Sequence, residues 1–276
     1  TLGNTGVSAL SWSLRELGTI SAPADNSITF TNEQIAEMTA MPKGSADKFT
    51  GPEVIDGFGG PDTFGYEWID SDEPGGPVFN WFDISGIGTQ ITSWTTGTGD
   101  DGTADVTLPF NFSYYGTSVA YSNTTIPAAG EPNYTLYAFW DDLDVRTSGG
   151  IFYYNDAVNN RFVIQYNNVP HYSSGGPYSF QIFLYTNGRI IFQYLTMATL
   201  LNSATIGIEN STGTDGLQTV FNNNYVHDNL AIKYEIGGIS WLSENPLNGT
   251  INSGGNQNID LTFSSNGLTA GTYAGR

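Results

Sequence analysis

The stretch with the clearest capacity for chemistry is Asp141-Asp142-Leu143-Asp144, which directly follows the aromatic run Tyr134–Trp140. Ca²⁺ prefers carboxylate and carbonyl oxygens as ligands and accepts loose geometries in loops. Because the aromatic run is expected to be a strand, the acids would gather several oxygens at the end of that strand. The spacing therefore predicts an optional Ca²⁺ site at Asp141, Asp142 and Asp144, and no cofactor that the chain requires.

Two other acidic stretches, Asp70-Ser71-Asp72-Glu73 and Asp100-Asp101, are second choices for the same ion. None of the stretches has the spacing of an EF-hand loop. Paired carboxylates also serve in general acid–base catalysis, but that chemistry needs a cleft that separates their pKa values. Because Asp is common in turns, where it hydrogen-bonds to the local backbone, we expect solvated strand ends rather than catalytic groups.

The two histidines, His171 and His227, form no recognisable catalytic or zinc motif. They lack the i, i+4 spacing of a helical zinc site. His227 stands beside Asp228, but a Ser-His-Asp triad is defined by geometry rather than by adjacency in the sequence. There is no Gly-x-Ser-x-Gly elbow either. The sequence therefore predicts a protein that is not an enzyme, with no catalytic residue to assign.

The charge balance excludes several partners. The chain has 276 residues, of which 27 are acidic and 8 are basic, giving a formal net charge of −19. Nucleic-acid binding needs clustered Lys and Arg, and an anionic lipid surface repels an acidic chain. No stretch approaches the ~20 apolar residues of a transmembrane helix. We expect neither nucleic-acid binding nor membrane insertion. The absence of cysteine excludes disulfides and thiolate metal sites.

Exposed aromatic rings offer one further binding chemistry, because they stack on the faces of sugars. Trp68, Trp81 and Trp94 lie amid polar turns and are the candidates for a glycan ligand. Tryptophan is, however, mostly a core residue by area, so burial of these rings is the favoured interpretation.

The elements that position these residues are predicted to be strands, because aromatic residues make up 14% of the chain and favour pleated surfaces. Asn187-Gly188, between Tyr178–Tyr185 and Arg189–Tyr194, is the strongest hairpin signal. One helix is expected at 32–38, with Asn32 as its cap and Pro42 beyond its end. Further strands, typical of a sandwich, are expected at Phe64–Asp70, Phe79–Ile84, Gln90–Trp94, Val106–Tyr115, Tyr134–Trp140, Gly150–Tyr154, Arg161–Tyr166, Ala204–Glu209, Leu217–Phe221 and Leu230–Glu235.

The middle of the chain resembles a nidogen-type β domain. An upstream block is similar to a segment that precedes such domains in large bacterial secreted proteins, and the resemblance as a whole covers residues 58–236. It implies a nidogen-like β domain over residues 51–237. The residues that carry it are Tyr137–Asp144, Gly149–Tyr154, Arg161–Tyr166 and Phe180–Tyr185, with the upstream block at Gly60–Tyr66 and Asp70–Gly76.

The stretch Trp241–Tyr273 resembles the opening of a BACON-like or related immunoglobulin-like domain. Such domains recur in bacterial surface proteins, sometimes beside secreted subtilisin-like proteases. The resemblance implies an extracellular or cell-surface location, adhesion or spacing, and no chemistry of its own. A complete sandwich of this type needs about seven strands and ~100 residues, whereas residues 238–276 supply about three strands.

The expected fold class is therefore all-β, with a β-sandwich-type main domain, an incomplete immunoglobulin-like domain at 238–276 and an extended N-terminal arm at 1–50. A few strands without partners leave sheet edges open. Three arrangements would cover them: the chain is a fragment of a longer protein, its own arm folds back, or the arm of a neighbouring chain pairs with them.

The third arrangement is strand complementation between subunits, which propagates head to tail into a filament. Residues 1–30 suit a donor because their strands are expected to be short and apolar and they carry few charges. The residues expected at this junction are Trp12, Ile20, Ile28, Phe30, Trp241, Ile259, Leu261 and Phe263.

The sequence thus favours a non-enzymatic extracellular structural or adhesive module that associates with itself, in its sharpest form a filament subunit. The alternative is an accessory region of a secreted hydrolase, such as a subtilisin-like protease, that binds carbohydrate or protein. A third candidate is a carbohydrate-binding module with structural Ca²⁺.

Overall fold

The computed structural model describes residues 1–13, 30–112, 123–128, 133–237, 242–246 and 248–263. Its regular structure is almost entirely β, which confirms the expected all-β class. The chain divides into two compact units, the larger at Ala22–Glu235 and the smaller formed by Thr1–Ser21 with Ile236–Arg276. The described residues 30–50, which the sequence placed in the N-terminal arm, group with the larger unit. Among the described residues, no helix is long and apolar enough to cross a membrane.

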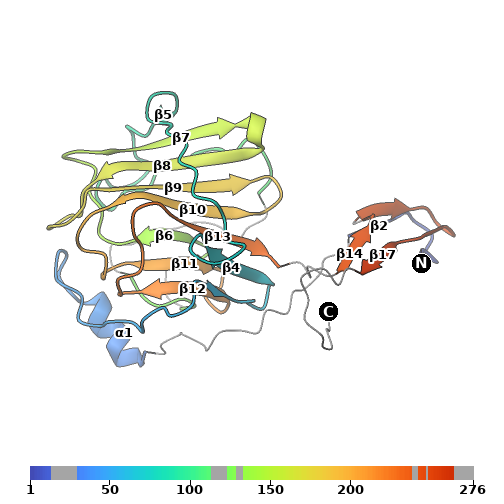
Figure 1. Cartoon of the computed structure of the whole chain (residues 1–276), viewed down its shortest axis with the longest axis horizontal. Coiled ribbons are helices and arrows are strands. Elements are labelled where there is room, and N and C mark those ends of the chain that lie inside the picture. The colour runs from blue at the N-terminus through green and yellow to red at the C-terminus, as the bar shows by residue number, and fades with distance from the viewer. Residues whose placement is uncertain (14–29, 113–122, 129–132, 238–241, 247, 264–276) are drawn as a thin grey trace. The chain divides into compact units, whose positions relative to one another are not determined.

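In its described residues, the larger unit has one helix, α1 (Asn32–Thr39), and two sheets. Its strands are β3 (Phe58–Gly59), β4 (Tyr66–Asp70), β5 (Thr89–Gln90), β6 (Leu136–Trp140), β7 (Gly150–Asp156), β8 (Arg161–Val169), β9 (Tyr178–Tyr185), β10 (Ile190–Met197), β11 (Thr205–Glu209), β12 (Gly216–Phe221) and β13 (Leu230–Ile236), with a 3₁₀ turn at Ala157–Asn159. One sheet has the order β3-β4-β13-β10-β9-β8-β7-β5, and the other has the order β12-β11-β6 (Figure 1).

Local sequence signals explain the helix and the central hairpin. Thr31, rather than Asn32, caps α1, because its hydroxyl accepts from Gln34 N at 3.3 Å while the Gln34 side chain accepts from Thr31 N at 2.9 Å. The hairpin at Asn187-Gly188 is confirmed, since β9 and β10 pair antiparallel across it. Gly188 has a φ of 87°, which glycine adopts without steric cost.

The core of the larger unit lies between the two sheets. The ring of Phe139, on β6, lies with its centroid 4.8 Å from that of Tyr178 and 6.0 Å from that of Phe180, both on β9. The Tyr194 hydroxyl, on β10, donates to the carbonyl of Ala138 on β6 at 2.6 Å. Aromatic packing and a buried hydrogen bond therefore join the sheets.

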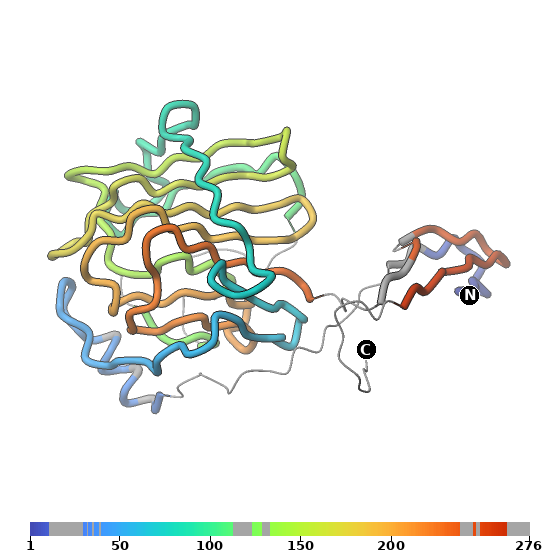
Figure 2. The backbone as a smooth tube through the Cα atoms, in the orientation of Figure 1, coloured from blue at the N-terminus to red at the C-terminus, as the bar shows by residue number. Residues whose placement is uncertain are grey.

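The opposite face of the large sheet is covered by the segment Phe79–Ile84, named here the strap, which crosses β10, β9 and β8 (Figures 1 and 2). The strap was expected to be a strand, but the structure assigns none to it. Its Ile84 packs in a buried cluster with Val163 and Phe183. Strand β9 is therefore covered on both faces, which explains its near-continuous apolar sequence.

Three buried glutamines lie beneath the strap. Gln193, Gln181 and Gln165 stand directly opposite one another on β10, β9 and β8, and their exposed fractions are 2%, 0% and 0%. Such polar side chains are found inside a protein only when their hydrogen bonds are made. We name this row the glutamine ladder.

The outer two glutamines of the ladder bind the backbone of the strap. Asn80 N donates to Gln193 Oε1 at 2.6 Å, and Gln193 Nε2 donates to Asn80 O at 3.1 Å. Ile84 N donates to Gln165 Oε1 at 2.9 Å. These amide groups take the place of the peptide groups that a neighbouring strand would offer.

Gln181 is the centre of the ladder. Its Nε2 donates to Phe82 O at 2.6 Å and to Gln165 Oε1 at 2.7 Å. The same amide therefore binds the strap and orients its neighbour, so the strap is fixed by side chains rather than by a strand ladder.

The part of the smaller unit that the structure describes contains three antiparallel two-stranded pairs: β1 with β16, β2 with β15, and β14 with β17. The first strand of two of these pairs comes from the start of the chain and the second from its end. Within one copy, the arm thus folds back, which is one of the three arrangements that the sequence left open. The strands are β1 (Leu2–Gly3), β2 (Leu10–Ser13), β14 (Leu242–Asn245), β15 (Asn248–Ile251), β16 (Asn256–Gln257) and β17 (Asp260–Phe263).

Candidate acidic site and terminal strand pairs

The three carboxylates expected to share a Ca²⁺ ion have different partners. Asp141 Oδ1 lies 3.3 Å from His171 Nε2. Asp144 is held by Arg146, whose Nε and terminal nitrogen each donate to it at 2.9 Å. Asp142 turns to a third environment. The local sequence places these acids together, but their carboxylates do not converge on one point.

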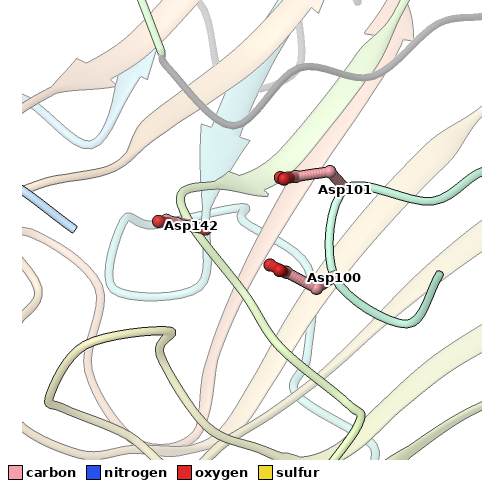
Figure 3. A group of neighbouring side chains, drawn as sticks. All are labelled: Asp100, Asp101 and Asp142. Atoms are coloured by element: carbon pink, nitrogen blue, oxygen red, sulfur yellow. The ribbon is translucent and has the colours of Figure 1, made fainter. Parts of the chain in front are cut away.

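Asp142 instead meets the second-choice pair Asp100 and Asp101, and one carboxylate oxygen from each of the three lies within 4.8 Å of the others (Figure 3). Asp142 follows β6, while the other two lie on a loop that an antiparallel bridge between Asp100 and Asp144 holds against it. We name Asp100, Asp101 and Asp142 the acidic cluster.

Lys43 supplies a cation to the acidic cluster. Its Nζ donates to Asp100 and to Asp101, and it lies 3.4 Å from Asp142 Oδ1. It also lies 4.4 Å from the centroid of the Tyr172 ring. Burial alone would lower the pKa of Lys43, but the hydrogen bonds to the two carboxylates outweigh burial and raise it. Sequence reasoning missed Lys43 because it lies in a stretch that reads as a linker.

Asp142 is the most constrained member of the acidic cluster. It is 7% exposed, and its Oδ1 makes no hydrogen bond within the described part of the chain. Burial raises the pKa of Asp142, and the charge of Lys43 offsets only part of that effect. A buried anionic oxygen without a donor is unfavourable.

A polar pocket of about 260 Å³ adjoins the acidic cluster. His171 lines this pocket. Burial alone would lower the pKa of His171, but its hydrogen bond to Asp141 and the charges of Asp141 and Asp142 raise it. Ser203 Oγ donates to Asp141 Oδ2 at 2.7 Å. The pocket is suited to a ligand that donates hydrogen bonds. Its lining includes Lys43, Asp47, Asn123, Asp141, Asp142, His171, Ser173 and Ser203.

The other acid–base candidates lie apart from this pocket. Asp70 is 3% exposed and accepts from the Tyr225 hydroxyl and from Asp72 N, and burial raises its pKa. His227 Nε2 lies 2.9 Å from Asp72 Oδ2 in an exposed pair. None of these contacts joins a nucleophile to a general base.

Of the three tryptophans considered for sugar stacking, Trp68 is 4% exposed and packs edge-on against Tyr225 at 6.3 Å. It belongs to the core. Trp81, on the strap, and Trp94 are half-buried.

The residues expected at a self-assembly junction fall into different environments. Phe30 lies in the larger unit, with ring centroids 5.3 Å from Phe49 and 5.4 Å from Phe221. Leu261 and Phe263 lie on β17 and are 55% and 66% exposed. Phe30 is therefore a packing residue, whereas the two residues of β17 are largely exposed.

The remaining junction residues are only partly described. Trp12 lies in β2, opposite Gly249 of β15, and Ile259 is half-buried beside β17. Ile20, Ile28 and Trp241 lie outside the described residues.

Asn4 fastens the N-terminal segment to the end of the chain, and sequence reasoning missed it. It is 7% exposed, and its Nδ2 donates to Ile251 O and to Ser8 O at 2.8 Å each. Its Oδ1 accepts from Gly6 N at 2.9 Å, and its backbone N donates to Gly255 O at 3.0 Å. An Asn in a polar stretch reads as an ordinary turn residue, so no signal in the sequence marked it.

Comparison with known proteins gives one match. Residues 117–253 match the family model described as NIDO related. The match supports the nidogen-type resemblance of the middle of the chain, and nothing supports the BACON-like resemblance of its last stretch. No curated protein and no solved structure matches the chain.

Proposed function

We propose that this chain is a non-enzymatic structural or adhesive module outside the cell. The match of residues 117–253 to the NIDO-related family model supports this, because such a domain fits an extracellular module. We propose further that copies associate by exchanging their terminal strands, so that β1 and β2 of one copy pair with β16 and β15 of the next.

The observation that carries the proposal is how little apolar surface the described part of the smaller unit buries. Ile251, 3% exposed, is the one buried apolar side chain among those described there. Leu261 and Phe263 remain largely exposed on β17. Isolated two-stranded sheets are marginal in water, and open edges with apolar side chains recruit further strands. A second copy would supply apolar surface against which these exposed side chains could be buried.

The N-terminal segment, which would act as the donor, already pairs with the end of the chain. Asn4 binds Ile251 across a sequence separation of 247 positions, so the contacts of the smaller unit join distant parts of the chain. Under this proposal the same contacts would form between two copies, because exchange of an identical element is a low-cost route to assembly. Head-to-tail repetition of that exchange leads to a filament.

The double substitution Leu261→Ser/Phe263→Ser is expected to weaken self-association at least about tenfold. Burying one such side chain is worth about 1.5–3 kcal/mol, and about 1.4 kcal/mol corresponds to tenfold in affinity. Sedimentation velocity over a range of concentrations measures the effect. The matched control is Val158→Ser, an apolar residue of the larger unit that is 90% exposed. A wild-type chain that stays monomeric at every concentration would oppose the proposal.

The alternative function, an accessory region of a secreted hydrolase that binds carbohydrate or protein, is favoured by the polar pocket of about 260 Å³. Its Asp, Asn and Ser side chains offer the hydrogen bonds that hydroxyl-rich ligands use. Glycan-array binding that persists in the Leu261→Ser/Phe263→Ser variant, and is lost in Asp141→Asn, would favour this alternative.

A further inference from the structure

Negative charge exceeds positive charge around the acidic cluster. Arg146, whose terminal nitrogen lies 3.0 Å from Asp100 Oδ2, is the second cation there beside Lys43. Two cations therefore face four carboxylates, those of Asp100, Asp101, Asp142 and Asp144. A divalent cation in place of the Lys43 ammonium would reduce this excess from two negative charges to one.

Lys43 does not bond equally to the three members of the acidic cluster. Its Nζ donates to Asp100 and to Asp101. Asp142 Oδ1, at 3.4 Å from Nζ, is beyond the usual range of an N–H···O bond. A buried carboxylate oxygen is thus directed at the cation position without receiving a hydrogen bond.

The spacing of the oxygens suits a metal ion. Ca²⁺ binds oxygen at about 2.3–2.6 Å, so two of its ligands stand at most about 5 Å apart. The three carboxylate oxygens of the acidic cluster lie within 4.8 Å of one another. They already have the separations of ligands around one ion, with no rearrangement of the two segments that carry them.

We propose that the acidic cluster is a Ca²⁺ site at which the ion and the ammonium of Lys43 compete for the same place. Ca²⁺ tolerates irregular oxygen ligands, whereas Mg²⁺ demands near-ideal octahedral geometry, so the cluster favours Ca²⁺. Because Lys43 also lines the polar pocket, its release by the ion would change the lining of that pocket. The site differs from the one expected at Asp141, Asp142 and Asp144, since it keeps only Asp142.

The test is calorimetric titration of the full chain with CaCl₂ alone, after treatment with a chelator. Wild type is expected to bind one ion, Lys43→Gln to bind it about tenfold more tightly, and Asp142→Asn about tenfold more weakly, since ligand charge tunes the affinity of such sites. The matched control is Asp105→Asn, which removes one charge from an exposed neighbouring position and should leave the affinity unchanged. If Asp142→Asn does not fold, Asp100→Asn replaces it.

Tightening in Lys43→Gln is the distinctive result, because loss of a merely structural lysine would not strengthen ion binding. The proposal is overturned if neither wild type nor Lys43→Gln takes up Ca²⁺ at millimolar concentration. It is equally overturned if only Lys43→Gln binds, because the lysine would then hold the place permanently. Equal weakening by Asp142→Asn and Asp105→Asn would reduce the effect to overall charge and overturn it as well.

Discussion

Replacing Gln181 by leucine is expected to lower the free energy of unfolding by about 2–4 kcal/mol. Leucine is similar in size but cannot donate to Phe82 O or to Gln165 Oε1, which both accept from Gln181 Nε2. A buried acceptor left without its donor costs about 1–3 kcal/mol, and breaking a buried network is among the few causes of larger losses. Urea unfolding monitored by tryptophan fluorescence measures the loss, and Trp81, one of the six tryptophans, lies on the strap itself.

The matched control for this substitution is Gln90→Leu, on β5 of the same sheet, where the side chain is exposed. Surface changes of this kind usually stay within about 0.5 kcal/mol. If Gln181→Leu were as stable as Gln90→Leu, the glutamine ladder would not be what holds the strap, and the apolar contacts of Ile84 would have to suffice.

The double substitution Leu10→Pro/Ser11→Pro is expected to abolish self-association while leaving the larger unit folded. Successive residues of a strand present their N–H groups alternately toward and away from the partner. Two adjacent prolines therefore remove at least one hydrogen bond from the β2–β15 pair, whichever chain supplies β15. Negative-stain electron microscopy and sedimentation velocity would show monomers where wild type forms larger species.

A proline in the same arm, but outside its strands, serves as the control. Val7 is 97% exposed and lies between β1 and β2, so Val7→Pro should assemble as wild type does. Assembly that survives Leu10→Pro/Ser11→Pro would show that β2 is not the donor and would leave β17 as the contact.

Much of the larger unit was predictable because its signals are local. Alternating runs around Asn187-Gly188 specify the β9–β10 hairpin without reference to the rest of the chain. The strap was assigned wrongly as a strand for a physical reason. Phe79–Ile84 is extended and apolar like a strand, but its hydrogen bonds go to glutamine side chains, a choice that depends on residues about a hundred positions away.

The acidic cluster illustrates the limit of spacing arguments. Asp141, Asp142 and Asp144 are close in sequence, yet their carboxylates diverge. The carboxylate of Asp142 lies near that of Asp100 because a bridge between Asp100 and Asp144 holds two distant loops together. Lys43 comes from a third segment with no regular structure. Only the fold brings these charges together, so the sequence identified the kind of chemistry but not the set of residues.

The central question is whether β2 of the same chain or of another copy pairs with β15. Disulfide cross-linking can answer it, because the chain contains no cysteine and any disulfide must form between introduced residues. Ser11 and Thr250 are register partners in the β2–β15 pair, and partners in antiparallel strands lie within the Cα separation of about 4.4–6.8 Å that a disulfide needs. Ser11→Cys and Thr250→Cys are made in separate chains, mixed, and oxidised. A mixture of Val7→Cys with Thr250→Cys is the control for random collisions.

Strand exchange predicts a disulfide-linked dimer of Ser11→Cys with Thr250→Cys, in clear excess over the Val7→Cys control, and a ladder of covalent oligomers when both cysteines are in every chain. If the mixture gives no excess, and chains with both cysteines form only internally bonded monomers, the arm folds back on its own chain and assembly by strand exchange does not occur.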